Sequence, residues 1–168
     1  INYFVEDENS YLINNANVKY EGTHLSAGEI YVDWKTDKLE ARIKDNIYPS
    51  VSGVGEKPTF GELLIYDLVT KRGKMIEGYT EYGQNNTMYY KGKKIYRNND
   101  LTYHISKSIL TSCDLENPHY YFKSNKMKMI PEERIFAKPM TLYLHDYPIF
   151  SIPFAVFPNK MGNRISGW

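Results

Sequence analysis

The sequence contains a single cysteine, Cys113, and the lack of a second one excludes any disulfide within the 168-residue chain. Cys113 is therefore a free thiol, as in a reducing compartment, or it pairs with a cysteine outside this chain. A run of about 18 apolar residues, the length of a membrane-spanning helix, is also lacking. The sequence thus predicts neither a disulfide-stapled domain nor a helical membrane anchor.

An excess of charge of either sign is missing too. The 21 Lys and Arg residues nearly balance the 20 Asp and Glu residues, which leaves a net charge of +1. Nucleic-acid-binding domains usually have a strongly basic face, so this balance argues against a nucleic-acid partner. What the chain has in abundance is tyrosine, with 16 Tyr against 7 Phe. Tyrosine favours strands and suits surfaces that are apolar on one edge and wet on the other.

Apolar and polar residues alternate with a period of two along much of the chain, which predicts half-buried strands with one apolar face. The apolar positions of these runs are Ile30, Val32 and Trp34; Leu39, Ala41 and Ile43; Leu101, Tyr103 and Ile105; Met127 and Met129; and Leu142 and Leu144. The period of a helix is hard to find. Only the stretch 59–69 fits a short helix as well as a strand.

Turn signals recur at short intervals, for example Glu21-Gly22, Lys91-Gly92-Lys93 and Asn98-Asn99-Asp100. The stretch 48–58, which contains Pro and Gly, is predicted to be a longer loop. A loose repeat of strand, polar turn and strand has its turns at 33–36 and 67–70. Short strands in repeated hairpins predict an all-β fold, a rolled sheet of stacked antiparallel strand pairs with little or no helix.

The last third of the chain is interrupted by prolines, namely Pro131, Pro139, Pro148, Pro153 and Pro158. Proline in sheets is confined to edges, strand starts and bulges. The apolar run 147–158 is therefore predicted to extend along a sheet edge or to approach a membrane interface. We divide the chain into a rolled domain, residues 1–146, and an extended Pro-rich segment, residues 147–168.

No catalytic motif is evident, and we expect no enzyme, metal or cofactor. His24, His104, His119 and His145 lack metal-ligand spacing, and no phosphate-binding loop or nucleophile motif occurs. The carboxylates of Glu132 and Glu133 are consecutive and follow Pro131, which predicts a solvated turn. A carbohydrate-active enzyme would need two facing carboxylates about 5–9.5 Å apart, and the sequence singles out no such pair.

Two basic clusters each allow two interpretations. They comprise Lys91, Lys93, Lys94 and Arg97, and then Lys123, Lys126 and Lys128. Such clusters attract the phosphates of lipid headgroups, but solvated strand faces and edges that resist aggregation also use lysine. The apolar strand faces are likewise either a core filled by side chains or a groove for acyl chains, which pliable Met residues suit.

The C-terminal half resembles the outer-membrane lipopolysaccharide-assembly proteins (LptD, also called organic solvent tolerance protein), most closely their Bacteroidetes branch. The residues that carry the likeness are the stretch 110–122 around Cys113, the strand-turn-strand pattern of 127–131 and 134–139, and the segments 147–154, 157–158 and 164–168. The last three resemble the junction that leads into the family's membrane barrel. Residues before about 102 share only the repeat style of the OstA-like family.

This resemblance implies a periplasmic β-jelly-roll or "β-taco" domain at the periplasmic face of the bacterial outer membrane. Lipopolysaccharide acyl chains would slide through the apolar interior toward the barrel for insertion in the outer leaflet. The implied partners are lipopolysaccharide, an OstA-like periplasmic bridge protein joined by edge-strand pairing, and the barrel of the same chain with its plug lipoprotein. The alternative is a structural β-solenoid or sandwich, such as an assembly or adhesin-like domain, whose core is filled by side chains.

The resemblance also assigns roles to residues. The candidates to line the lipid groove are Ile30, Val32, Leu101, Tyr103, Ile105, Phe122, Met127, Met129, Ile135, Ala137, Leu142 and Leu144. The candidates to contact headgroups are Lys91, Lys93, Lys94 and Arg97. Cys113 lies where the family places a cysteine that bonds to the barrel, although the second N-terminal cysteine of proteobacterial members is missing here.

Overall fold

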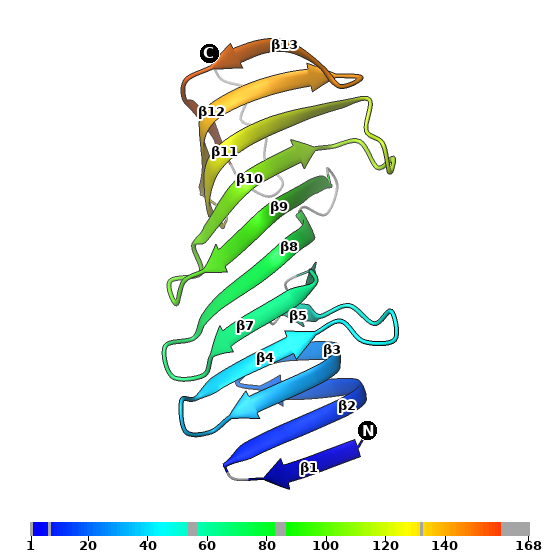
Figure 1. Cartoon of the computed structure of the whole chain (residues 1–168). Coiled ribbons are helices and arrows are strands. Elements are labelled where there is room, and N and C mark those ends of the chain that lie inside the picture. The colour runs from blue at the N-terminus through cyan, green and yellow to red at the C-terminus, as the bar shows by residue number, and fades with distance from the viewer. Residues whose placement is uncertain (1, 7, 54–56, 83–86, 132, 159–168) are drawn as a thin grey trace.

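The chain folds as one antiparallel sheet, seen in a computed structural model that describes residues 2–6, 8–53, 57–82, 87–131 and 133–158. The all-β prediction is confirmed, and no described residue is helical (Figure 1). The fourteen strands are β1 (Asn2–Glu6), β2 (Asn9–Tyr20), β3 (Thr23–Asp33), β4 (Lys38–Arg42), β5 (Ser50–Ser52), β6 (Thr59–Phe60), β7 (Leu63–Asp67), β8 (Arg72–Tyr82), β9 (Met88–Arg97), β10 (Tyr103–Thr111), β11 (Tyr120–Ile130), β12 (Arg134–Leu144), β13 (Tyr147–Ile152) and β14 (Ala155–Pro158).

The strands stack in the order β1-β2-β3-β4-β7-β8-β9-β10-β11-β12-β13, from one end of the molecule to the other (Figure 1). Strand β3 pairs with both β4 and β5, and strand β8 pairs with both β7 and β6. Because β4 also pairs with β7, and β5 with β6, two separate paths of paired strands connect β3 to β8. These six strands form a closed ring. The prediction of a single loop over 48–58 was wrong in part, since it contains β5.

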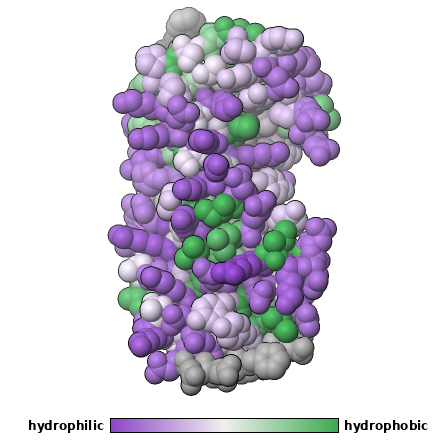
Figure 2. Space-filling view, in the orientation of Figure 1, coloured by the Kyte–Doolittle hydropathy of each residue, from purple (hydrophilic) through white to green (hydrophobic). Residues whose placement is uncertain are grey.

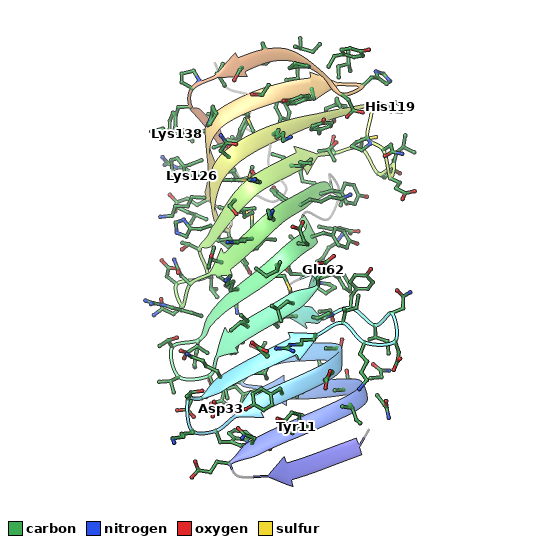
Figure 3. All side chains as sticks on the ribbon, in the orientation of Figure 1. Tyr11, Asp33, Glu62, His119, Lys126 and Lys138 are labelled. Carbon is green, nitrogen blue, oxygen red and sulfur yellow. The ribbon has the colours of Figure 1, made fainter. Side chains whose placement is uncertain are left out.

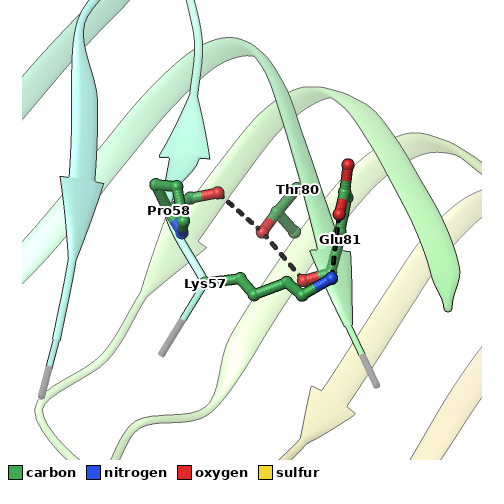
Figure 4. Close-up of polar contacts among 4 residues, drawn as sticks. All are labelled: Lys57, Pro58, Thr80 and Glu81. Atoms are coloured by element: carbon green, nitrogen blue, oxygen red, sulfur yellow. Dashed lines mark hydrogen bonds and ion pairs between the residues drawn. The ribbon is translucent and has the colours of Figure 1, made fainter. Parts of the chain in front are cut away.

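Polar contacts fix the short strand β6 beside β8 (Figure 4). The hydroxyl of Thr80 donates a hydrogen bond of 3.2 Å to the carbonyl of Pro58, and the ammonium of Lys57 lies 2.9 Å from the carboxylate of Glu81. A strand of two residues has few ladder hydrogen bonds of its own. These side-chain contacts therefore help to close the ring.

The long strands bend in the middle, and each contributes to two packed layers. We call arm 1 the layer built from β1, β4, β7, β14 and the adjoining halves of the long strands, and arm 2 the layer built from β5, β6, β13 and the opposite halves. The bend, which we call the crease, passes through residues that the ladders skip: Glu77, Lys93, Lys107, Asn125 and Pro139. Glu77 and Lys107 have a positive φ there.

The crease shifts the phase of burial by one residue. On either side of it the buried positions are three apart rather than two, as in the pairs Met75 and Gly78, Ile95 and Gly92, Ile105 and Ser108, Met127 and Ser124, and Ala137 and Met140. The shift keeps the apolar face of each strand on the inside of the bend. The interior between the arms is therefore mainly apolar on both sides.

Residues immediately inside the crease on arm 2 are small, because the two layers approach each other closely there. In register across β8 to β11 these residues are Gly78, Gly92, Ser108 and Ser124. A Cβ added at Gly78 would lie 2.6 Å from Cδ1 of Ile95. The turn predicted at Lys91-Gly92-Lys93 was wrong, since Gly92 lies within β9 and serves this close approach.

We expect Gly92→Ala to destabilise the fold by about 1–3 kcal/mol, the usual cost of overpacking a core. The added Cβ would overlap Cγ2 of Ile105. Urea unfolding measures the change in free energy. The control is Gly73→Ala, where the nearest atom, in Tyr66, is 3.4 Å away. Combining Gly92→Ala with Ile105→Ala should cost less than the sum of the two single changes; full additivity would contradict this packing.

The loose sequence repeat corresponds to two matching turns at the tip of arm 1. The carboxylate of Asp33 accepts hydrogen bonds from the backbone of Lys35 and from the backbone and hydroxyl of Thr36. Asp67 accepts bonds from the backbone of Val69 and Thr70 in the same way. In both turns the hydrogen bonds from the threonine, Thr36 or Thr70, are the main cause that holds the pKa of the aspartate below its usual value.

These two carboxylates should make the fold acid-sensitive. A pKa that is lower in the folded than in the unfolded chain adds stability above the ordinary Asp value of 3.8, and this stability is lost as the pH falls through the lowered folded value. The double variant Asp33→Asn, Asp67→Asn should therefore lose less thermal stability than the wild type when the pH is lowered below 3.8. The exposed Asp114→Asn serves as control. An unchanged acid transition in the double variant would refute the assignment.

Candidate functional site: an apolar interior and a basic outer face

The interior of arm 1 has two rows of side chains that run across neighbouring strands in register. One row is Ile30, Ala41, Leu64, Met75, Ile95, Ile105, Met127, Ala137 and Ala155, and the other is Val32, Leu39, Tyr66, Gly73, Arg97, Tyr103, Met129, Ile135 and Phe157. Every side chain of the first row except Ala155 is at most 4% exposed. The first row is thus apolar without interruption from β3 to β14, whereas the charged Arg97 interrupts the second row.

The structure brings together most of the residues predicted to line a groove. Ile30, Val32, Ile105, Met127, Met129, Ile135 and Ala137 are buried, Tyr103 and Phe122 pack against them, and Leu142 is half-buried beside Phe122. Phe122 of arm 2 lies 6.2 Å from Phe157 of arm 1, measured between ring centroids. The two arms therefore touch at the C-terminal end of the interior.

Leu101 and Leu144 do not belong to this set, and their predicted inward placement is wrong. Leu101 is 43% exposed with a φ of 61°, because it lies in the turn before β10 and not in the strand. Thr102 is buried in its place, and Asp100 binds both its backbone NH and its hydroxyl. Leu144, at the last position of β12, is 47% exposed.

Several interior residues were missed by the sequence prediction of the groove, among them Leu39, Ala41, Leu64, Tyr66, Met75, Ile95 and Leu110. The alternation over 38–42 and 63–67 was a usable signal for the first four. Met75 and Ile95 lie close to the crease, where the one-residue phase shift hides the period. Leu110 lies beyond the same shift in β10.

The two arms leave little free space between them. A cavity of about 30 Å³ is lined from arm 2 by Val51 and Thr59 and from arm 1 by Tyr66, Met75 and Arg97. This volume holds about one or two water molecules and is far too small for an acyl chain. In the described conformation the interior near this cavity is filled mainly by the protein's own side chains.

The four headgroup candidates do not form one cluster. Lys91 and Lys94 point outward and Lys93 lies at the crease, and all three are exposed. Arg97 is half-buried and contributes to the inner row, between Gly73 and Tyr103. Successive residues of a strand point to opposite faces of the sheet. Lys94 and Arg97 are three positions apart in β9, so Lys94 points outward and Arg97 points inward.

A larger basic surface extends over the outside of the C-terminal half. Strands β9 to β14 contain no Asp or Glu, and their outward or crease positions carry Lys91, Lys93, Lys94, Lys107, Lys123, Lys126, Lys128 and Lys138. We call these eight lysines the basic face. Among the described residues none of them forms an ion pair, and Lys126 is directly opposite Lys138 across β11 and β12 (Figure 3).

Cys113 lies in the loop between β10 and β11, at the tip of arm 2, and is half-buried. Its Sγ is 3.8 Å from Nδ1 of His119, whose ring lies 5.5 Å from that of His145. Within the described residues no group of three or more His, Cys, Asp or Glu side chains is arranged to hold a metal ion. Glu132 of the predicted carboxylate pair lies outside the described residues, as does the 164–168 motif.

Comparison with protein-family models and with curated proteins finds no match for this chain. The family resemblance of the C-terminal half is therefore still a prediction. No helix that is long and apolar enough to cross a membrane occurs in the described residues. The shape, the interior and the charge distribution of the molecule are the features that bear on its function.

We expect Lys138→Glu to stabilise the fold by about 0.2–1 kcal/mol, because like charges directly opposite in a sheet repel and opposite charges attract. Urea unfolding at low salt measures the change. The control is Lys91→Glu, whose cross-strand neighbours, Tyr79 and Ile109, are uncharged. A loss of stability in the Lys138 variant, or an equal gain in the control, would show that Lys126 and Lys138 do not repel each other.

Proposed function

We propose that this chain is a lipid-carrying domain, the periplasmic part of an outer-membrane lipopolysaccharide translocon. It would accept lipopolysaccharide from a periplasmic bridge and guide the acyl chains toward a membrane barrel. The observation that carries the proposal is the row from Ile30 to Ala155, which is apolar throughout and continues in register through the roll from β3 to β14. The resemblance of the C-terminal half adds the class of lipid.

The ends of the roll support this proposal. Strand β1 is the outermost strand of arm 1 at one end, and among the described strands the half of β2 beyond Ile13 pairs with β3 alone. At the other end β13 and β14 flank β12 without a further partner among the described strands. Open edges accept strands of a second protein by β-augmentation. Such pairing would continue the inner rows into the periplasmic bridge protein at one end of the roll and into the membrane barrel at the other end.

Passage of a lipid would require the arms to separate at the side opposite the crease. The arms are joined by covalent chain at the crease, whereas side-chain packing holds them together elsewhere. Acyl chains offer the interior the same apolar surroundings that the packed side chains offer each other, so the exchange costs little hydrophobic free energy. Met75, Met127 and Met129 add side chains that repack easily.

A second candidate is a structural roll whose core is permanently filled by side chains. The observation that favours it is the burial of the inner row, which is nearly complete without any ligand. This alternative gives the edges the same role in assembly but assigns no cargo to the interior. The two candidates differ in whether lipid reaches the interior side chains.

Photo-crosslinking at two adjacent positions of β11 separates the candidates. A photoreactive residue at Phe122 faces the interior, and one at Lys123 faces outward. With lipopolysaccharide added to the purified chain, the carrier predicts a crosslink at Phe122 that is several-fold stronger than at Lys123. A crosslink at Lys123 alone, or at neither position, would reject lipid carriage and favour the structural roll.

A further inference from the structure

We propose that the basic face, together with the neighbouring edge of β14, is a docking surface for an anionic phospholipid bilayer. The surface lies on the outside of the roll and is separate from the interior that the proposed function uses. The proposal rests on charge, on the apolar residues that follow Lys128 toward the edge of the sheet, and on the absence of acidic residues from these strands. It does not depend on whether the interior carries lipid.

The lysines form rows across the strands. Lys94, Lys126 and Lys138 lie in one register row that also contains Ser106, and Lys91 and Lys123 lie in a second one with Ile109 between them. Lys93 and Lys107 connect the two rows at the crease. Over β9 to β12 the face visible in Figure 2 is mainly hydrophilic. The first row lies on the outer side of arm 1 and the second on the outer side of arm 2, so the charges extend around the crease and are not gathered in a pocket.

Apolar side chains follow Lys128, which lies in a third register row, toward the edge of the sheet. Lys128 is followed across β12 and β14 by Phe136 and Val156, all on the outer side of arm 1. Phe154 lies 6.4 Å from Phe136 between ring centroids and is 55% exposed, and Val156 is 46% exposed. Exposed apolar side chains beside lysines on one face match a membrane interface, where rings enter the headgroup layer and ammonium groups reach the phosphates.

A bilayer explains features that a single small anion does not. The eight lysines of the basic face have no ion-pair partner among the described residues, and Lys126 and Lys138 are opposed at a cost in stability. A surface of many phosphates against the outer side of arm 1 and the crease neutralises the lysines of those two regions together. Opposed lysines beside an exposed phenylalanine are unfavourable in water and favourable on an anionic membrane, which indicates what covers this face.

Vesicle co-sedimentation of the purified chain tests the proposal. We expect binding to vesicles of phosphatidylcholine with phosphatidylglycerol, no binding to phosphatidylcholine alone, and a loss of binding as the salt concentration rises. Lys126→Gln with Lys138→Gln should weaken binding about 5-fold for each charge removed. Phe154→Ser should weaken it as well. Circular dichroism verifies that each variant is folded.

Matched controls separate this face from overall charge and apolarity. Lys19→Gln with Lys35→Gln removes the same charge from exposed positions in the N-terminal half, and Val69→Ser removes an exposed apolar side chain there. Both controls should bind like the wild type, and equal losses in them would overturn the proposal. Binding to lipopolysaccharide micelles but not to phosphatidylglycerol vesicles would also overturn it, since the face would then serve cargo. Failure of the Phe122 crosslink would leave the vesicle result unaffected.

Discussion

The close packing of two halves of one sheet at the crease determines the rest of this structure. The long strands can fold back only because glycine and serine line the inside of the bend, so that Ile95 and Ile105 of arm 1 fill the space next to Gly78 and Gly92. The bend in turn keeps one apolar face inward along the whole roll. The ring of β3 to β8, the in-register rows and the outward lysines all follow from that geometry.

Alternation of apolar and polar residues was enough to predict the strands, the rolled sheet and most of the interior face. It failed where local chemistry competed with it. At Leu101 an Asp-capped turn takes the strand's place, and at Gly92 a turn signal marks a bend within a strand. The pairing of β3 with β5 and of β8 with β6 depends on contacts far apart in sequence. The basic face spans several strands, so the sequence showed it only as two separate clusters.

The interior and the outer face suit two different contacts with lipid. Inside, the rows are apolar apart from Arg97, but the described conformation fills them with side chains, so the proposed carrier function requires movement of the arms. Outside, lysines and exposed aromatic rings are present without any such movement. The same strands, β9 to β12, carry both surfaces. A domain held against a membrane by its outer face would keep the C-terminal end of its interior close to the bilayer.

Lipid carriage through the interior requires the two arms to separate when lipid binds, and the distance between the two tips of β10 measures this separation. Spin labels on cysteines at Asn99 and Glu116, in a Cys113→Ser background, report on the two exposed tips. Pulsed electron paramagnetic resonance on the chain with and without lipopolysaccharide gives the distance distribution. We expect a longer distance when lipopolysaccharide is bound. An identical distribution in the presence of saturating lipid would show that the roll stays closed and would contradict lipid carriage through its interior.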